Sequence, residues 1–421
     1  MSVSRRQFIK GSAAIAGAAA FVPTALQRAL ASSVASRPAA QVPAGERTLV
    51  VVQMAGGNDG LNTIIPANDD RYYELRPLLA QPAGDVLPLD ASVGLHRVLA
   101  PFKELWDEGA LAAVEGVGYP DPSFSHFQSM DTWQTADPSG RTFEGWLGRY
   151  LEGIAAEQSG RVQSLSVGRK LPRAFWSHRV SVPMVRNIES YRLQPDPKDR
   201  IDARGRDLVL AGLYTSSPDT LPYGALLAGT LEAAQSSSAA LQEAHSAYTP
   251  QAEYPDTPLA NGLRLLAEAI TGDDIGLRVG HVRIGGFDTH ASQVGDHEAL
   301  LTDVAGSIRA FYRDLQAHGR DRNVVIMTWS EFGRRVTENA SSGTDHGSAG
   351  PMFVVGTPIK GGLYGERPSL GDLERNNLKF TTDFRSVYAT VLEDWLGAPS
   401  ELLLGGRYER LPFLRPEAVA S

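Results

Sequence analysis

The 421-residue chain contains no cysteine. Disulfide bonds, thiolate metal ligands and cysteine nucleophiles are therefore excluded, so a metal site would have to use carboxylates and imidazoles. Long apolar runs are also missing. The mildly apolar stretch Gly11–Val22 is shorter than the roughly 20 residues that a membrane-spanning helix needs, and no other segment is longer. We therefore expect no stable membrane span once the N-terminal signal is removed.

Basic residues are outnumbered by acidic ones, 40 to 48, which gives a formal net charge of −8. Four basic residues and no acidic ones lie in residues 1–31, so removal of this segment takes the charge to −12. An acidic surface repels the phosphate backbone, and we expect no nucleic-acid partner. The sequence leaves the oligomeric state open.

The N-terminus has the features of an export signal. Ser4–Lys10 (SRRQFIK) is a twin-arginine pattern, the apolar stretch follows it, and Ala29-Leu30-Ala31 offers a small-residue cleavage site. These features predict a signal peptide at residues 1–31 and a periplasmic or secreted protein. A linker is expected at residues 32–47, followed by one α/β domain at residues 48–415.

Short apolar runs bounded by turn residues predict buried strands, and amphipathic stretches between them predict helices. The predicted strands are Thr48–Met54, Ala110–Val117, Val162–Val167, Gly276–Ile284, Val324–Thr328, Met352–Val355 and Asn377–Thr382. Strands that alternate with helices indicate a largely parallel sheet covered on both faces, which is a three-layer α/β/α sandwich. The Pro-, Asp-, Ser- and Ala-rich stretch Tyr191–Gly262 is interpreted as a helical insertion.

Polar residues follow several of these strands. They are Asp59, Ser125 with His126, Asp288 with His290, Glu331, and Asp345 with His346, the last two preceding a strand. Parallel strands bring their carboxyl ends to one edge of a sheet, so these side chains are expected to converge. Alternative interpretations remain for single residues: Asp59 as part of a tight turn alone, and Asp288 as a helix cap alone.

The converging residue types favour a divalent metal site. Carboxylates and imidazoles without thiolates suit Zn²⁺, Mn²⁺ or Mg²⁺, and one or two ions are expected. The predicted metal ligands are Asp59, Asp288, His290, Glu331, Asp345 and His346. Ser125 is either a helix N-cap or a nucleophile, with His126 beside it. Arg334 (or Arg335) is either an anion-binding group or part of a solvated turn or of a salt bridge to Glu338.

Six ordered motifs also resemble the domain-of-unknown-function family 1501. They are GGNDGLNTIIP, GLH, PDPSFSHFQ, GGFDTH, SEFGRR and TDHGSAGPMFVVG, and they span the chain from about Thr48 to Leu404. That family is in turn similar to the alkaline phosphatase and sulfatase superfamily, whose members are α/β/α sandwiches with metals at the strand ends. The resemblance implies that Asp59, Asp288, His290 and His346 bind metal and that Ser125 lies near the nucleophile.

Three departures from the superfamily pattern qualify this resemblance. The superfamily's Asp and His are usually more widely separated than Asp288 and His290. Ser330-Glu331 stands where the superfamily has an Asp-His dipeptide, and Pro120 stands where sulfatases have the cysteine or serine of their Pro-Ser-Arg motif. A formylglycine sulfatase is therefore not expected. Two hypotheses remain: an exported metal-dependent hydrolase that acts on a small anionic phosphate or sulfate ester, and a non-catalytic periplasmic binding or assembly module that retains the fold.

Overall fold

Strand β1 (Thr48–Met54) lies near the centre of a nine-stranded sheet in the computed structural model, which describes residues 47–155, 162–188, 191, 212, 224–272 and 275–419. The predicted signal peptide and nearly all of the predicted linker lie outside the described residues. So does most of the predicted insertion before residue 224. The rest of that stretch contains helix α8 (Gly224–Ala247) and the start of α9.

The main sheet is almost entirely parallel. Its strands in spatial order are β13 (Gly362–Tyr364), β5 (Leu111–Gly118), β12 (Gly350–Val355), β9 (Val324–Trp329), β1, β8 (Val279–Ile284), β6 (Ser164–Val167) and β7 (Met184–Val185), with β16 (Thr382–Asp383) also paired to β5. Only β12 runs antiparallel to its neighbours among these described strands. The predicted largely parallel sheet is confirmed.

The reversed strand β12 has a consequence for the site. Its first residue, Gly350, lies at the edge where the parallel strands end. The chain therefore leaves β9 and enters β12 at the same edge. Between them it forms a hairpin of β10 (Gly333–Glu338) and β11 (Thr344–Gly347), in which Arg334 pairs with His346. The hairpin places the two polar segments of this one connection beside each other.

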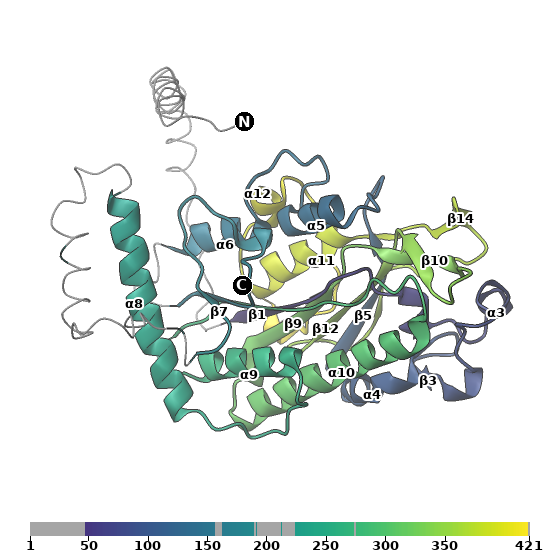
Figure 1. Cartoon of the computed structure of the whole chain (residues 1–421), viewed down its shortest axis with the longest axis horizontal. Helices are drawn as coiled ribbons and strands as arrows, with labels where there is room; N and C mark the ends of the chain where they lie inside the picture. The colour runs from purple at the N-terminus through teal and green to yellow at the C-terminus, as the bar shows by residue number, and fades with distance from the viewer. Residues whose placement is uncertain are drawn as a thin grey trace, which may run out of the picture. The chain divides into compact units, whose positions relative to one another are not determined.

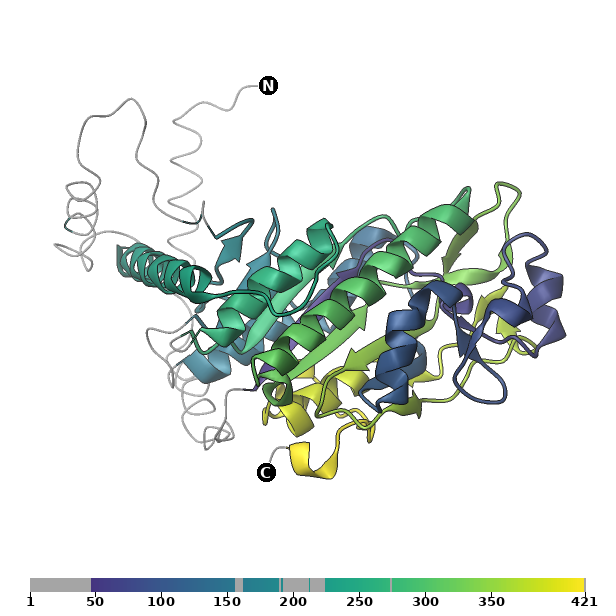
Figure 2. The ribbon, with the colours of Figure 1, turned by 90° about the horizontal axis from the view of Figure 1, so that it is seen from below.

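Helices cover both faces of the sheet (Figures 1 and 2). On one face lie α4 (Ala100–Asp107), α9 (Pro258–Thr271) and α10 (Gln293–Ala317), and on the other α5 (His126–Thr135), α6 (Trp146–Ile154) and α11 (Phe384–Thr390), which continues as a π-helical turn over Val391–Trp395. Every residue of β1 is buried because the strand alternates between the two cores: Val50 and Val52 pack in one, Leu49 and Val51 in the other. The predicted three-layer α/β/α sandwich is confirmed.

The remaining elements are short and peripheral to the main sheet. They include α3 (Asp70–Leu75), α12 (Ser400–Leu404), the small sheet of β2 (Ile64–Ile65), β3 (Leu87–Pro88) and β4 (Gly94–Leu95), and the pair β14 (Leu373–Glu374) and β15 (Asn377–Leu378). The predicted strand at Asn377–Thr382 is thus divided between β15 and the beginning of β16.

Candidate functional site

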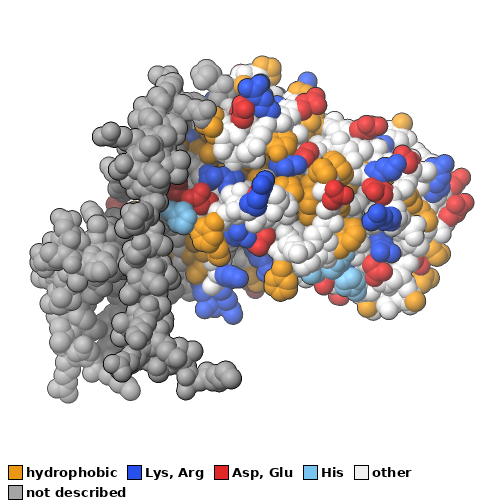
Figure 3. Space-filling model, turned by 90° about the horizontal axis from the view of Figure 1, so that it is seen from above, with side chains coloured by type: hydrophobic (Ala, Val, Ile, Leu, Met, Phe, Trp, Pro, Cys, Tyr) orange, Lys and Arg blue, Asp and Glu red, His pale blue; other side chains and the backbone are white. Residues whose placement is uncertain are grey.

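The polar segments that the sequence places after separate strands meet at the carboxyl edge of the sheet. After β8, residues alternate between buried and exposed: Phe287 and Thr289 are buried, whereas Asp288 and His290 are exposed. Two residues apart in an extended segment share one side, so Asp288 and His290 face the same space. Figure 3 shows histidine side chains at the surface beside acidic ones.

Three imidazoles surround the carboxylate of Asp288. His290 Nε2 and His346 Nε2 each lie 3.0 Å from Asp288 Oδ1, and His126 Nε2 lies 3.3 Å from Asp288 Oδ2. The Nε2 atoms of His290 and His346 are 3.0 Å apart. The three-histidine cluster is defined here as His126, His290, His346 and Asp288. Four sequence-predicted residues are thereby brought together, although His126 was predicted for catalysis and not as a ligand.

The other ring nitrogen of two of the histidines is hydrogen-bonded to an oxygen, and that of the third lies near one. His346 Nδ1 donates to the carbonyl of Phe124 at 2.7 Å, and His126 Nδ1 donates to Glu331 Oε1 at 2.9 Å. His290 Nδ1 lies 3.5 Å from Asp345 Oδ1. In a neutral imidazole whose Nδ1 carries the proton, Nε2 presents a lone pair. A ring that gives up its Nε2 proton therefore directs a lone pair toward Asp288, an arrangement that is attractive when a cation lies between them.

These donors fit a small divalent cation. In the described part of the chain, one set of three ligand-type side chains has ligand atoms within 4.8 Å of one another, namely His126, Asp288 and His346. With bonds of about 2.0–2.2 Å, neighbouring ligands of a tetrahedral ion lie about 3.3–3.6 Å apart. The spacings of 3.0–3.3 Å between the imidazoles and Asp288 need only a small outward shift, whereas His290 lies outside the mutually close set of three. Metal-binding histidines usually donate their second N–H to a carboxylate or carbonyl, as His126 and His346 do here.

Asp288 is held in its ionised form. Its partial burial would raise the pKa of the carboxyl group, but hydrogen bonds from His346 and Arg334 and the charges of Arg334 and His290 outweigh this and hold the pKa well below its usual range. The side chain is still 45% exposed, so it is accessible from solvent. An ionised and accessible carboxylate is the form that binds a cation.

Glu331 contacts the cluster from its buried side. The side chain is 1% exposed, and its Oε1 accepts hydrogen bonds from the Gly56 amide and from His126 Nδ1. Its neighbour Ser330 donates to the carbonyl of Met54 at 2.7 Å and accepts from the Asn58 amide. The predicted ligand Glu331 is therefore placed where it orients His126 and ties the loop after β9 to the loop after β1.

The glycine pair after β1 allows the loops to approach closely. Gly56 has φ +127°, and a Cβ atom there would lie 2.4 Å from the amide nitrogen of Asp288. A side chain at this position would push away the segment that carries Asp288 and His290. The glycines of the GGND motif therefore serve the site through backbone packing.

Arg334 does not present a free guanidinium to an anion, which corrects the prediction that it is catalytic. The side chain is buried, and its N–H groups donate to the carbonyls of Gly57, Thr344, Gly56 and Phe287 and to Asp288. A guanidinium that satisfies four carbonyls and one carboxylate fixes the loops around it. The predicted alternative, a solvated turn, is also wrong because the side chain is only 1% exposed.

Asp59 also differs from its predicted role as a metal ligand. It is buried at 1% exposure, and its Oδ2 accepts hydrogen bonds from Arg76 Nη1 at 2.6 Å and from Gln293 Nε2. Burial raises the pKa of Asp59, but the charge and hydrogen bond of Arg76 lower it by a larger amount, so the pKa is lowered overall. The carboxylate belongs to a buried salt bridge, not to the three-histidine cluster.

Two further predicted residues adjoin the cluster: Ser125 precedes His126 in the chain, and Asp345 lies beside His290. Ser125 occupies the N-cap position of α5 directly before His126, yet its side chain forms no capping hydrogen bond and is exposed. The N-cap interpretation therefore lacks its hydrogen bond, and the nucleophile interpretation remains a prediction. Asp345, at 53% exposure, faces His290 Nδ1 and does not join the converging Nε2 atoms.

Several contributors were missed from the sequence. The ring of Phe332 packs against His126 and His346, with centroid distances of 4.9 and 4.4 Å. The carbonyl of Phe124 orients His346, and Gln293 Oε1 accepts from Thr289 and Thr344 and so joins the two ligand-bearing loops. The motif SEFGRR could have suggested an aromatic wall at Phe332. A backbone carbonyl leaves no sequence signal.

Comparison with protein families gives two matches. The family model described as "Protein of unknown function (DUF1501)" matches residues 109–404, and the model of the twin-arginine translocation signal matches residues 2–22. Export by the twin-arginine pathway is therefore confirmed. Among the described helices, none is both long and apolar enough to cross a membrane. Comparison with curated proteins gives no match.

Three solved structures illustrate what this chain is similar to. They are the PsFucS1 sulfatase from Pseudoalteromonas sp. (11% identity, TM-score 0.39, covering 89% of this chain and 73% of that one), a protein in the alkaline phosphatase superfamily from Vibrio parahaemolyticus (7%, 0.34, 77% and 64%) and the C-terminal periplasmic domain of EcEptC from Escherichia coli in complex with Zn (12%, 0.36, 76% and 74%). At these values the similarity supports no inference about residues or reaction.

Proposed function

The chain belongs to the family described as "Protein of unknown function (DUF1501)", and we propose that it is an exported, metal-dependent hydrolase of phosphate or sulfate esters. The convergence of three histidine Nε2 atoms on the accessible carboxylate of Asp288 carries this proposal. Folding does not explain these exposed side chains, because buried hydrogen bonds beside them already hold the loops together.

One divalent ion would be held by Asp288, His126 and His346, and His290, which contacts Asp288 and His346, would join as a fourth ligand by moving toward His126. Three imidazoles and one carboxylate favour Zn²⁺ or Mn²⁺ over Mg²⁺, which prefers oxygen ligands. A cation bound there supplies Lewis acidity, which stabilises the charge that develops on the oxygens of an ester undergoing displacement. Within the described residues the ligand geometry supports one ion, and Asp59 and Glu331 act as structural partners.

Ser125 is assigned as the nucleophile in this proposal. Its hydroxyl is exposed, precedes the ligand His126 and lies at the N-terminus of α5, where free backbone N–H groups favour an anionic group. Attack by the hydroxyl oxygen on phosphorus or sulfur breaks the ester bond, and the alcohol leaves with a proton. Water then releases phosphate or sulfate and restores the hydroxyl. A direct attack by water is the alternative, and it does not require Ser125.

Metal binding is the first test. We expect the full chain, purified without chelator, to bind about one equivalent of Zn²⁺ or Mn²⁺ in calorimetric titration, and Asp288→Asn to weaken binding by more than about 100-fold because an ionised ligand is lost. Asp296→Asn is the matched control, since Asp296 is an exposed acid in the first turn of α10. Equal affinity of Asp288→Asn and wild type would refute the site.

Turnover is the second test. Aryl phosphates and aryl sulfates are assayed with Zn²⁺, Mn²⁺ and Mg²⁺ for wild type, Asp288→Asn and Ser125→Ala. We expect metal-dependent release of the aryl alcohol that is lost in Asp288→Asn. Retention of activity in Ser125→Ala would assign the attack to water. Tight metal binding without turnover of either ester class would instead support a non-catalytic periplasmic module.

A further inference from the structure

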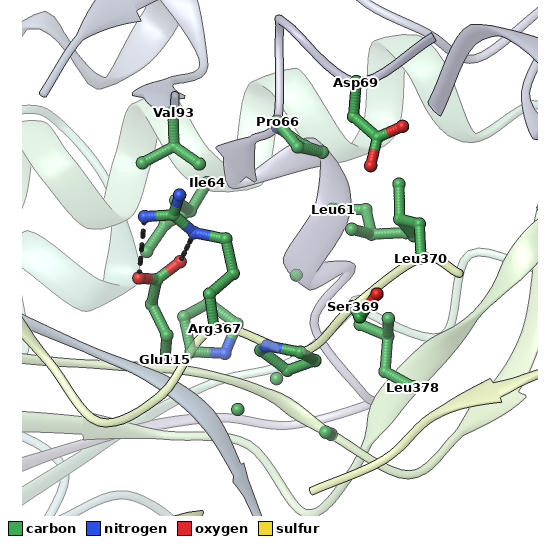
Figure 4. A pocket seen from close by; sticks show the side chains of 16 residues that line it. Leu61, Ile64, Pro66, Asp69, Val93, Glu115, Arg367, Ser369, Leu370 and Leu378 are labelled. Carbon is green, nitrogen blue, oxygen red and sulfur yellow. Dashed lines mark hydrogen bonds and ion pairs between the residues drawn. The ribbon is translucent and has the colours of Figure 1, made fainter. Parts of the chain in front are cut away.

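A second concave feature lies apart from the three-histidine cluster, between the loop after β1, strand β5 and the segment before β14 (Figure 4). The cavity has a volume of about 220 Å³. Its walls are mainly aliphatic and include Leu61, Ile64, Val93, Pro351, Leu370 and Leu378. No residue of the three-histidine cluster lines it, so its role does not depend on the proposed hydrolase.

Charged side chains occupy two opposite sides of this apolar cavity. On one side Glu115, in the middle of β5, receives two hydrogen bonds from Arg367, with lengths of 2.7 and 3.0 Å (Figure 4). A buried acid in an otherwise apolar strand needs such a partner, and Arg367 also lies 3.6 Å from Asp90. The positive charge of Arg367 is therefore already neutralised by two carboxylates.

On the other side the carboxylate of Asp69 is incompletely neutralised. One oxygen accepts the N-capping hydrogen bond from the Arg71 amide, and the other lies 3.9 Å from the Arg71 guanidinium, whose side chain is 56% exposed. Asp69 itself is 34% exposed and lines the cavity (Figure 4). A ligand in the cavity therefore meets one negatively charged hydrogen-bond acceptor, Asp69, that is free to pair with it, and no cation that is free to pair with it.

We propose that this cavity binds a small, largely apolar molecule that carries a primary amine, with the ammonium group at Asp69 and the apolar body against the aliphatic wall. An engineered apolar cavity of about 150 Å³ holds benzene, so about 220 Å³ accommodates a benzyl group with its aminomethyl substituent. Anionic molecules are disfavoured because the free charge at the wall is negative. The site therefore takes a different chemical class from the anionic ester of the proposed hydrolase.

The test uses three ligands of nearly equal shape. Benzylamine, benzyl alcohol and benzoate are titrated into the full chain and followed by ligand-observed NMR and calorimetry. We expect saturable binding of benzylamine, about threefold to tenfold tighter than benzyl alcohol, because a partly exposed ion pair contributes modestly. Benzoate should bind more weakly than both.

Two variants and one control locate the binding. Asp69→Asn removes the charge while retaining a good N-cap for α3, and should abolish the advantage of benzylamine over benzyl alcohol. Asp70→Asn, at the adjacent exposed acid, should leave that advantage unchanged. Leu370→Trp fills the cavity and should weaken both ligands. Native circular dichroism and an unchanged melting profile establish that each variant is folded.

Three results would overturn the proposal. They are the absence of saturable benzylamine binding to the wild-type chain, benzoate affinity equal to that of benzylamine, and an undiminished preference for benzylamine in Asp69→Asn. Metal content and ester turnover are measured on the same preparations. Failure of the metal site then leaves this proposal standing, and the reverse also holds, because the two sites share no lining residue.

Discussion

Asp59 and Asp288 follow neighbouring parallel strands, β1 and β8, and each accepts a hydrogen bond from a buried arginine. Their surroundings nevertheless differ. Asp59 is 1% exposed, forms a salt bridge with Arg76 and accepts a hydrogen bond from Gln293. Asp288 is 45% exposed and is surrounded by three imidazoles. The pKa of each carboxyl group is lowered against the effect of burial, so both are ionised.

The difference shows that the direction of a pKa shift does not identify a binding carboxylate. Both side chains are anions at a strand end, but of the two only Asp288 lies among imidazoles that could share a cation with it, whereas Oδ1 of Asp59 is buried without a hydrogen-bond partner. Asp59 stabilises a buried arginine that in turn holds the carbonyls of Arg335 and Val336 on β10. Asp59, through Arg76, therefore fixes the hairpin that carries His346, and Asp288 contacts the His346 side chain.

The largest expected effect is on folding. Arg76→Met leaves Asp59 as an unpaired buried charge, and we expect a loss of about 3–5 kcal/mol in the free energy of unfolding. Urea denaturation at unchanged slope measures this loss. Arg71→Met, in the helix that Arg76 directly follows, is the control and should cost about 1 kcal/mol or less, because Arg71 is 56% exposed. If the two variants were equally stable, the buried salt bridge would not be the support described here.

Acidification should reveal the same buried network through His297, whose Nε2 lies 3.0 Å from Asn58 Oδ1. Burial lowers the pKa of His297 to about 4, while the charge of Asp59 acts in the opposite direction. In the unfolded chain this histidine has a pKa of about 6.5 and binds a proton below that pH, whereas in the folded chain it remains neutral until about pH 4. Stability therefore falls as the pH decreases from about 6.5 to 4 and is unaffected by this group at higher pH.

The variant His297→Gln isolates this contribution because glutamine retains an N–H donor for Asn58 but does not titrate. We expect the stability difference between pH 6.5 and pH 4 to be smaller in the variant by about 3 kcal/mol. Denaturant unfolding at both pH values gives the difference. His178→Gln, at an exposed histidine, should reproduce the wild-type pH dependence. An identical dependence in His297→Gln would contradict the assignment.

Metal affinity should respond to a change at Glu331, the buried carboxylate that contacts His126. Glu331→Gln preserves the shape of the side chain but removes the negative charge that orients His126, and we expect metal affinity to fall about 10-fold to 100-fold. Asp59→Asn provides the contrast: it should reduce stability but leave metal affinity within about threefold of wild type. Calorimetric titration with Zn²⁺ measures both. A larger loss of affinity in Asp59→Asn than in Glu331→Gln would reverse the roles assigned to the two acids.

Much of the fold was predictable because buried parallel strands are apolar on both faces, as the β1 sequence TLVVVQM illustrates. The edge of convergence followed from the same argument, which correctly joined Asp288, His290 and His346. The separate roles of Asp59, Glu331 and Arg334 were not predictable. They depend on partners such as Arg76, which lies 17 residues from Asp59 in the chain, and on carbonyls that have no sequence signature.

The smallest expected effect concerns Asp345, the acid beside the third imidazole. Its Oδ1 lies 3.5 Å from His290 Nδ1, too far for a normal hydrogen bond, and the side chain is 53% exposed. Solvent screens such a pair, so Asp345→Asn should weaken Zn²⁺ binding only about twofold to threefold. Its effect should also decrease with added salt, whereas that of Glu331→Gln should persist because Glu331 is buried. If Asp345→Asn proved as damaging as Glu331→Gln, Asp345 would have to move to the metal ion when the site is loaded, and the ligand set would then include a second carboxylate.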